Sequence, residues 1–491
     1  MAKVTTVIDI GSNSMRMAVF EKSSRFGFHL INESKSRVKI SEGCYENGGN
    51  LQEIPMQRAF DAMRSFLQIA KTLGSNKILC VATSALRDAP NSHEFTSRVS
   101  SEFGLKIKVI DGIKESYFGG VAAINLLEAN DFISIDIGGG STEFCLAQDG
   151  AILENVSLNI GTVRLKELYF DKNDIEGAKN LIYSELEKLQ TFLDSKINTL
   201  VGIGGTARAV ARSIIKRDKY PLEILHGFEY EYEKNRPLLD KIIEAKNTSV
   251  YEDCYIKADR FDTIKEGIFI YKTICDFFQI NKVITSGVGV REGVYLSDLL
   301  RGNGNKFPAN YNPSIRSLID RFDFCNDVTS YLGTNAGAIF DALKPLHNLD
   351  DKFKKDLTIA SKLLMVGVSL NFYKNSDHAF NFILNGLDYG FSHKRRVLIA
   401  HIVKFSKKNL PKFNDLIGFD ILLPDVRTLQ WLSYMNSLNS AIAQDCFMEK
   451  CHYSLKDDIL TIKTKNRHYL GKNTITNIVK PKKFDIVMTE L

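Results

Sequence analysis

The sequence predicts an α/β protein with two duplicated domains, followed by a mainly α-helical C-terminal domain. The duplication is visible in a short pattern that occurs twice, at Asp9–Ser14 and at Asp136–Thr142. Each copy closes a β-branched, apolar run with an Asp and a turn of Gly and hydroxyl residues, which predicts a strand and a tight turn. Strands alternate with amphipathic helices after both copies, and from about residue 314 the helical period dominates.

Length and composition describe an ordinary globular protein of about three domains. The chain has 491 residues, of which 44% are hydrophobic and 25% are charged, and its formal net charge is +6. No apolar stretch reaches the roughly 20 residues of a membrane-spanning helix. The first residues predict a strand, so we expect no signal peptide. Its eight cysteines are scattered and complete no zinc site. We expect a cytoplasmic protein with reduced thiols and no membrane partner.

The internal repeat continues beyond the two Asp-Gly turns. Val81–Arg87 and Val201–Arg208 each predict the end of a strand, a small-residue turn and the start of a helix. Asp9 and Asp136 are 127 positions apart, and Val81 and Val201 are 120 apart, so the repeat is a duplicated domain. Helices are expected over 55–72 and 175–193, a linker over 301–308, and domains over 1–126, 127–304 and 305–491.

The C-terminal domain carries two kinds of local signal. Residues 459–464 and 475–479 alternate with period two and predict a short hairpin or β extension. Two basic clusters, 394–396 and 404–408, fall on the helical part. They are either a solvated face or a track for a polyanion.

The two Asp-Gly turns are the main candidates for function. Backbone N–H groups in such turns can approach an anion closely, and the Asp can hold a divalent cation that also binds phosphate oxygens. Two such turns in similar halves suit a cleft that holds one phosphate chain from opposite walls. P-loop and dinucleotide-binding folds are disfavoured, because no G-x-x-x-x-G-K-[ST] loop is present and no G-x-G-x-x-G turn opens a helix after a strand.

Four charged residues beside the predicted turns each have two interpretations. Arg16 and Arg87 are either solvated surface charges or bidentate ligands, each guanidinium binding two phosphate oxygens. Glu115 opens a helix, where it is either a partner of the helix dipole or a base that activates water. Glu143 is either a solvated strand residue or an acid that reaches a metal ion or water.

The motifs together resemble the exopolyphosphatase / guanosine pentaphosphate phosphohydrolase (Ppx/GppA) family, whose domains have the ribonuclease H-like fold of actin, sugar kinases and heat-shock chaperones. The resemblance covers about residues 4–300 in the segments VIDIGSNSMRMAVFE, ATSALRDAPN, DGIKESYFGG, IDIGGGSTEF, LNIGTVRLKE, VGIGGTARAVA and SGVGVREGV. It implies that Asp9, Asp136 and Glu143 are associated with Mg²⁺. It also implies that two glutamates are catalytic, with Glu115 as the general base and Glu143 as a second acidic residue of the site. The candidate phosphate-binding residues are Gly11, Ser12, Asn13, Ser14, Arg16, Arg87, Gly138, Gly139, Gly140, Ser141, Thr142, Gly204, Gly205 and Thr206.

The activity implied by this resemblance is Mg²⁺-dependent release of terminal phosphate from inorganic polyphosphate, from the 5′ end of guanosine pentaphosphate, or from both. Where members often have Glu-Glu-Ala-Arg, this chain has Lys114-Glu-Ser-Tyr117, which keeps the base and changes its neighbours. The C-terminal domain resembles HD hydrolases, but His378 lacks metal partners. We therefore expect a non-catalytic binding module that pairs two subunits as a homodimer, and no sequence-specific nucleic-acid partner.

Two other functions suit the same cleft. A small-molecule kinase of the same superfamily would bind adenosine near residues 201–207 and transfer phosphate from ATP to an acceptor. A nucleotide sensor would bind an alarmone without hydrolysis. Asp9, Asp136 and Glu115 argue against the sensor, because binding alone needs no base.

Overall fold

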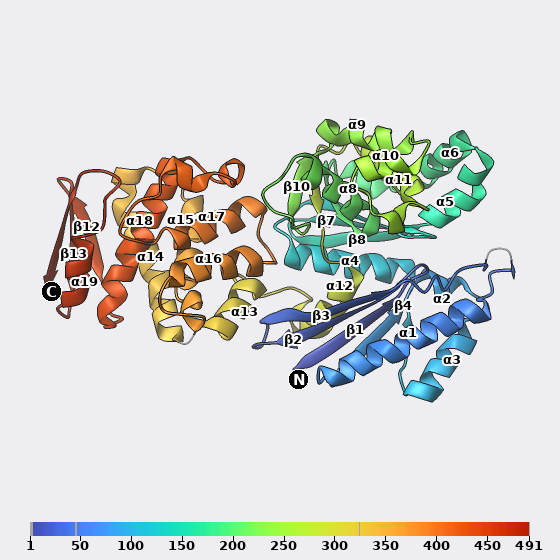
Figure 1. Ribbon diagram of the computed structural model, residues 1–491, viewed down its shortest axis with the longest axis horizontal. Coiled ribbons are helices and arrows are strands. Elements are labelled where there is room, and N and C mark those ends of the chain that lie inside the picture. Colours follow the sequence, from blue (N-terminus) through green and yellow to red (C-terminus); the bar gives the residue numbers. More distant parts are fainter. Residues whose placement is uncertain (1–2, 45–46, 324, 491) are drawn as a thin grey trace. The chain divides into compact units, whose positions relative to one another are not determined.

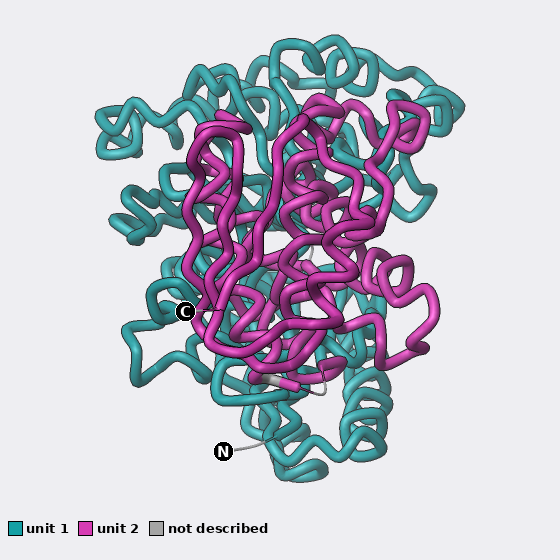
Figure 2. The backbone as a smooth tube through the Cα atoms, turned by 90° about the vertical axis from the view of Figure 1, so that its left-hand side faces the viewer, with its two compact units in different colours: residues 1–311 teal, residues 312–491 magenta. Residues whose placement is uncertain are grey.

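The computed structural model describes residues 3–44, 47–323 and 325–490. The chain forms two compact units, Met1–Tyr311 and Asn312–Leu491 (Figure 2). The first unit contains a five-stranded and a six-stranded sheet with helices around them (Figure 1). Residues 305–311, which the sequence analysis assigned to the C-terminal domain, belong to this first unit.

The first sheet has the strand order β3-β2-β1-β4-β5. Strands β1, β2 and β3 are antiparallel neighbours, whereas β4 and β5 run parallel to β1. Both faces of β1 are buried, which is typical of a strand between two layers of helices. The strands are β1 (Val4–Ile10), β2 (Met15–Lys22), β3 (Phe28–Ser36), β4 (Lys77–Ala82) and β5 (Lys108–Val109).

The second sheet repeats this topology. Read from β8, its order is β8-β7-β6-β9-β11, and β10 is added at the far edge. Strands β6, β7 and β8 are again antiparallel, and β9 and β11 run parallel to β6. The duplication predicted from the two turns is therefore a duplication of whole sheets. The strands are β6 (Phe132–Ile137), β7 (Thr142–Gln148), β8 (Ala151–Leu158), β9 (Thr199–Ile203), β10 (Phe228–Glu231) and β11 (Lys282–Thr285).

Two helices, α4 (Gly112–Leu126) and α12 (Val290–Leu299), lie between the two sheets (Figure 1). They pack very closely, because a Cβ on Gly293 would lie 1.9 Å from the carbonyl oxygen of Phe118. Helix α1 covers the other face of the first sheet, and α8 and α11 cover that of the second. The remaining bounds in this unit are α1 (Glu53–Thr72), α2 (Ser84–Asp88), α3 (Ser92–Phe103), α5 (Thr162–Leu168), α6 (Ile175–Leu186), α7 (Gln190–Asp194), α8 (Gly204–Arg217), α9 (Tyr232–Ile243), α10 (Thr248–Asp253) and α11 (Ile264–Phe277).

Helix α1 confirms the helix expected over 55–72, but the helix expected over 175–193 is wrong. That segment is divided into α6 and α7. Leu186, Leu189 and Phe192 on both sides of the break are fully buried in one core. No Gly or Pro lies there, so packing rather than local propensity decides the break.

The second unit has seven helices and one small sheet among its described residues. Helix α18 (Val426–Ile442) is buried on nearly all sides, with Trp431 and Tyr434 in its core. The other helices are α13 (Pro313–Phe322), α14 (Asn326–His347), α15 (Lys352–Lys362), α16 (Asn375–Gly386), α17 (His393–Lys404) and α19 (Tyr469–Ile475).

The C-terminal β extension differs from the prediction. The strand expected over 459–464 is present as β13 (Ile459–Thr464), with β12 (His452–Lys456) and β14 (Asp485–Glu490) beside it. The strand expected over 475–479 is absent, because Ile475 ends helix α19. Ile475 and Ile478 are both buried, and their spacing of three residues suits a helical turn better than a strand.

The first basic cluster of the second unit is not an exposed track for a polyanion. Arg396 is 1% exposed and lies 3.4 Å from the carboxylate of Asp388. Arg395 lies 2.6 Å from the carboxylate of Asp356. In the second cluster, Lys407 is paired with an acid on α16. No helix of the described chain is long and apolar enough to cross a membrane.

The segment expected as a linker packs against the first unit. The Asn305 carbonyl accepts a hydrogen bond from the Asn125 amide at 2.8 Å, and the Asn305 amide donates to the Tyr117 hydroxyl at 2.6 Å. The ring of Phe307 stacks on Tyr311 with the centroids 5.6 Å apart. A chain cut near Asn305 would lose these contacts.

We expect a chain that ends at Tyr311 to fold independently, and a chain that ends at Gly304 to be less stable. The difference in the free energy of unfolding should be on the order of 2 to 4 kcal/mol, from two hydrogen bonds and the aromatic packing. Urea unfolding of the two truncated chains measures it. Equal midpoints and slopes would show that residues 305–311 contribute nothing to the unit.

Candidate active site

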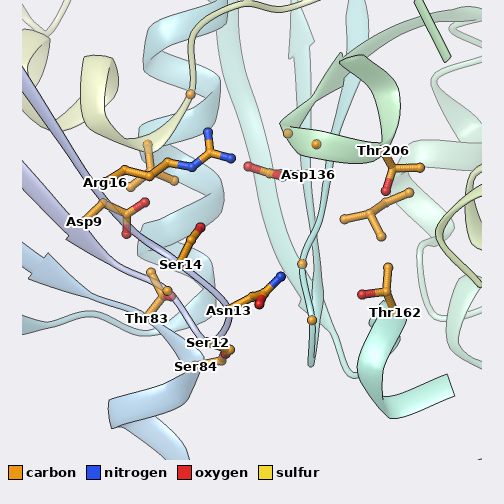
Figure 3. Close-up of a pocket in the computed structure, with 18 of the residues that line it drawn as sticks. Asp9, Ser12, Asn13, Ser14, Arg16, Thr83, Ser84, Asp136, Thr162 and Thr206 are labelled. Carbon is orange, nitrogen blue, oxygen red and sulfur yellow. The ribbon is translucent and has the colours of Figure 1, made fainter. Parts of the chain in front are cut away.

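One polar pocket in the first unit brings the two Asp-Gly turns together (Figure 3). The turn after β1 forms one wall, and the turn after β6 with the start of α8 forms the opposite wall. The predicted site residues that line it are Asp9, Gly11, Ser12, Asn13, Ser14, Arg16, Glu115, Asp136, Gly138, Gly139, Ser141, Glu143, Gly204, Gly205 and Thr206.

The two turns have the same backbone geometry. In the first, the Gly11 N–H donates to the Ser14 carbonyl at 3.3 Å, and in the second, the Gly138 N–H donates to the Ser141 carbonyl at 2.9 Å. In the register of the strands, Asp9 on β1 lies opposite Arg16 on β2. Asp136 on β6 lies opposite Glu143 on β7 in the same way. Arg16 and Glu143 thus occupy equivalent positions, so the duplicated scaffold carries a cation in one half and an acid in the other.

Two residues of the second turn, Gly140 and Thr142, do not line the pocket. The Thr142 hydroxyl donates to the Ile160 carbonyl, and the Gly140 carbonyl accepts from Arg164 Nε at 3.1 Å. A Cβ on Gly161 would lie 2.4 Å from the Gly139 carbonyl oxygen. Gly140 and Thr142 therefore hold the turn against the segment that leads into α5.

Asp136 lies beside the N-terminus of α8. Gly204 has a φ of +79°, and a Cβ there would lie 2.0 Å from Asp136 Oδ1, so only glycine suits this position. Burial raises the pKa of the Asp136 carboxyl, and Arg208, Arg16 and Arg260 oppose that rise. In Figure 3 the side chain of Arg16 extends from the opposite wall toward Asp136.

Glu115 is placed by the first turn of α4. The Asp111 carboxylate caps this helix by accepting from the Lys114 N–H at 2.6 Å. Glu115 Oε2 is buried and has no hydrogen-bond partner among the described residues, and Arg87 Nη1 lies 3.5 Å away. Burial, and then the negative charges of Glu143 and other nearby acids, raise the pKa of Glu115 well above its usual value. Arg87 does not line the pocket itself but adjoins it through Glu115.

Glu143 is only 5% exposed and is held by two hydroxyl groups. Its Oε1 accepts from Ser141 Oγ at 2.6 Å and from Ser157 Oγ at 3.0 Å. Burial raises its pKa to about 7, although both serine hydrogen bonds oppose the rise. The solvated interpretation of Glu143 is therefore wrong.

Asp9 is the second acid with a buried oxygen that accepts no hydrogen bond. Its Oδ1 has no hydrogen-bond partner among the described residues, and burial raises its pKa to about 6. Arg291 and Arg16 oppose the rise, whereas Asp136 adds to it. An unpaired carboxylate oxygen that repels a neighbouring acid suits a hard divalent cation.

The predicted trio Asp9, Asp136 and Glu143 does not form a closed metal site. Within the described chain, no three Asp, Glu, His or Cys side chains are grouped closely enough to hold a metal ion. A cation at Asp9 and Asp136 would take its other ligands from water and phosphate oxygens, as Mg²⁺ commonly does.

The pocket also contains residues that the sequence analysis missed. Arg208 is half-buried and its Nε donates to the Ser286 carbonyl at 2.9 Å. Desolvation lowers its pKa to about 10. Arg291 is 5% exposed and lies 2.7 Å from the Glu33 carboxylate. Both arginines fall in motif segments that carried the resemblance, whereas other lining residues fall in no motif. The latter include Lys35, Arg37, Asp259, Arg260 and Thr263.

Glu143 should make the stability of the protein depend on pH. Because its pKa is 4.5 in the unfolded chain and about 7 when folded, the folded state holds an extra proton between these values. The free energy of unfolding should fall as pH rises through that window in metal-free buffer. Glu143→Gln should flatten the fall, and urea unfolding at pH 4.5, 6 and 7.5 measures it. An unchanged slope in the variant would show that Glu143 is not the group responsible.

The duplicated sheets define a protein of the actin-like fold class. The model of the Ppx/GppA phosphatase family matches residues 18–302 of the sequence. The chain belongs to this family and is a hydrolase by class. This confirms the resemblance and the fold class inferred from the sequence.

Known relatives cover different shares of the chain. A bifunctional 3-dehydroquinate synthase/phosphatase from Fusobacterium nucleatum is 30% identical over 57% of this chain, and the chain spans only 44% of that relative. A guanosine-5′-triphosphate,3′-diphosphate pyrophosphatase from Pseudoalteromonas translucida is 25% identical over 94% of this chain and 92% of its own length.

Two solved structures each resemble about three fifths of the chain. The Aquifex aeolicus member of the Ppx/GppA family has a TM-score of 0.53 and 27% identity, and covers 62% of this chain and 99% of its own. An exopolyphosphatase from Cytophaga hutchinsonii has a TM-score of 0.56 over 62% of this chain and 100% of its own, with 22% identity, and so supports the fold alone.

Proposed function

We propose that this protein is a Mg²⁺-dependent phosphohydrolase that removes the terminal phosphate of guanosine pentaphosphate, of inorganic polyphosphate, or of both. The observation that carries the proposal is the Glu115 carboxylate in the same pocket as the two turns, with a buried oxygen that lies beside Arg87 but accepts no hydrogen bond. A base needs an oxygen that can accept a hydrogen bond from water, and a binding protein does not.

The two turns and the arginines bind the terminal phosphates in this proposal. The two turns line the pocket from opposite walls, and the Gly11 and Gly138 N–H groups close the turns. Other backbone N–H groups of these turns would bind phosphate oxygens. Arg16 comes from the first wall, and Arg87 adjoins Glu115. These charges oppose the negative charge of the phosphoryl group throughout the transfer.

Glu115 then orients a water molecule and accepts its proton. The water oxygen forms a bond to the terminal phosphorus, the bond from that phosphorus to the bridging oxygen breaks, and the shortened chain leaves with the bridging oxygen. The raised pKa of Glu115 makes its carboxylate a stronger base than an exposed glutamate.

The cation would be held by Asp9 and Asp136, with Glu143 nearby. When bound, Mg²⁺ would neutralise phosphate charge that the arginines leave uncompensated. Burial raises the pKa of Asp9, the negative charge of Asp136 adds to that rise, and a cation between the two acids would relieve both effects.

Guanosine pentaphosphate is the substrate that we expect to be preferred. The relative that aligns over nearly the whole chain is named for hydrolysis of that nucleotide. A cavity beside the pocket, which would receive the rest of a substrate, is strongly basic. It is lined by Arg16, Lys35, Arg208, Arg212, Lys257 and Arg260, with Asp259 as its acid.

The wider setting follows from the substrate. Guanosine pentaphosphate is an alarmone, so we propose a cytoplasmic enzyme of the stringent response. We propose that the helical second unit is an HD-like, non-catalytic module that pairs two subunits. The subdivision of the first unit at 126/127 belongs to the same proposal.

Phosphate release from guanosine pentaphosphate and from long polyphosphate, measured side by side with Mg²⁺ and with a chelator, tests the proposal. We expect Mg²⁺-dependent release from at least one, and faster release from the nucleotide. Tight nucleotide binding without release would favour the sensor, and phosphate transfer from ATP to a sugar would favour the kinase.

A further inference from the structure

Two ion pairs cross from one half of the first unit to the other at the rim of the pocket. Lys35 Nζ, at the end of β3, lies 3.6 Å from the carboxylate of Asp259, and Arg37 Nη2 lies 2.7 Å from the carboxylate of Asp262. The acids belong to the segment that leads into α11. Lys35, Arg37 and Asp259 line the pocket. All four side chains are between 34% and 47% exposed, so water and ions reach both pairs.

The cations of these pairs stand among other cations. Burial, and then the nearby cations Arg16 and Arg260, lower the pKa of Lys35. Burial, and then nearby cations that include Arg37, lower the pKa of Arg260. Asp259 and Asp262 therefore offset part of a dense positive charge at the entrance. A phosphate chain that enters would bring anionic oxygens to the same cations, and exposed pairs of this kind are weak enough to be exchanged.

We propose that Lys35 and Arg37 are specificity-determining residues that exchange Asp259 and Asp262 for phosphates of the entering substrate. A ligand with one phosphate cannot replace both carboxylates, whereas a chain of phosphates can. The two pairs thereby select for substrates with several phosphates and against orthophosphate. The inference rests on the proposed function for the class of ligand, but its test reads binding and needs no turnover.

The sign of the mutational effects separates this exchange from a fixed bridge between the halves. If carboxylate and phosphate compete for one cation, removing the acid strengthens ligand binding and removing the cation weakens it. If each pair only holds the halves in place, removing either partner has the same consequence, because the same bond is lost.

Calorimetric titration of the full chain with tripolyphosphate in chelator, repeated with orthophosphate, provides the test. Asp259→Asn and Asp262→Asn should each tighten tripolyphosphate binding about threefold, and Lys35→Gln and Arg37→Gln should each weaken it about threefold, as expected for exposed pairs. Both effects should shrink as salt rises. The changes for orthophosphate should be smaller.

Matched controls correct for net charge. Asp253→Asn and Lys246→Gln alter exposed charges outside the pocket, in the half of the unit that carries Asp259. Each control should change tripolyphosphate binding by less than half as much as the rim variants. Effects of equal sign for acid and cation, or control effects as large as those at the rim, would overturn the exchange. If the binding changes have the predicted signs but the protein hydrolyses no phosphate anhydride, the exchange is supported and the proposed function is refuted.

Discussion

Glu115→Gln should retain the fold and substrate binding and lose about 10²- to 10⁴-fold in turnover, the usual cost of removing a general base. The amide has nearly the same shape but cannot accept a proton from water. Glu115 lies in the first turn of α4 with a buried oxygen that accepts no hydrogen bond, so this oxygen can accept one from a water molecule. Steady-state turnover with guanosine pentaphosphate, together with nucleotide binding in chelator, measures both quantities.

The control for this variant is Glu94→Gln. Glu94 also lies in the first turn of a helix, α3, but is exposed and away from the pocket. If Glu115 served only the helix dipole, both variants would lose a few tenths of a kcal/mol of stability and no turnover. Turnover of Glu115→Gln within a few-fold of the unaltered protein would exclude Glu115 as the base.

The pH profile of turnover supplies a second check. Because burial raises the pKa of Glu115, its carboxylate becomes protonated as pH falls through that raised value. Turnover should therefore decline toward acid pH sooner than for an exposed glutamate.

Asp9→Asn and Asp136→Asn should each raise the Mg²⁺ concentration for half-maximal activity by at least about tenfold, because a hard cation needs anionic oxygen. The same changes should leave the metal-free protein as stable or more stable, since the raised pKa values show that both charges are costly where they lie. Mg²⁺ titrations of activity and urea unfolding in chelator measure the two effects. Asp253→Asn is the control.

Unchanged Mg²⁺ titrations in both variants would remove these acids from the metal site. Loss of stability together with loss of activity would instead indicate that the two carboxylates hold the fold. Opposite movement of activity and stability is characteristic of residues retained for function.

Much of the fold was readable from the sequence because its signals are local. The strands before both Asp-Gly turns and helix α1 are present where they were expected. Each depends on the period of apolar residues within one short segment. The break between α6 and α7 and the helix at Tyr469–Ile475 were not readable, because contacts distant in sequence decide them.

The two turns of the candidate site were readable for the same reason, and the charges around them were not. Lys35, Arg37 and Arg260 follow no motif, and only the assembled sheets bring them to one pocket. Conversely, the basic run 394–396 reads as exposed, yet Arg396 is buried beside Asp388. Whether a charged side chain is solvated depends on its spatial neighbours, which a linear pattern does not contain.

The sequence by itself determined the duplication, the position of both turns and the acids that end their strands, because backbone geometry there depends on adjacent residues. Only the tertiary structure decided which of those groups are charged and free to act. One oxygen of Asp9 and one of Glu115 are buried without a hydrogen-bond partner, and burial raises the pKa values of both carboxyls. Those properties arise from desolvation and from charges on other elements, so they exist only once the two halves face each other.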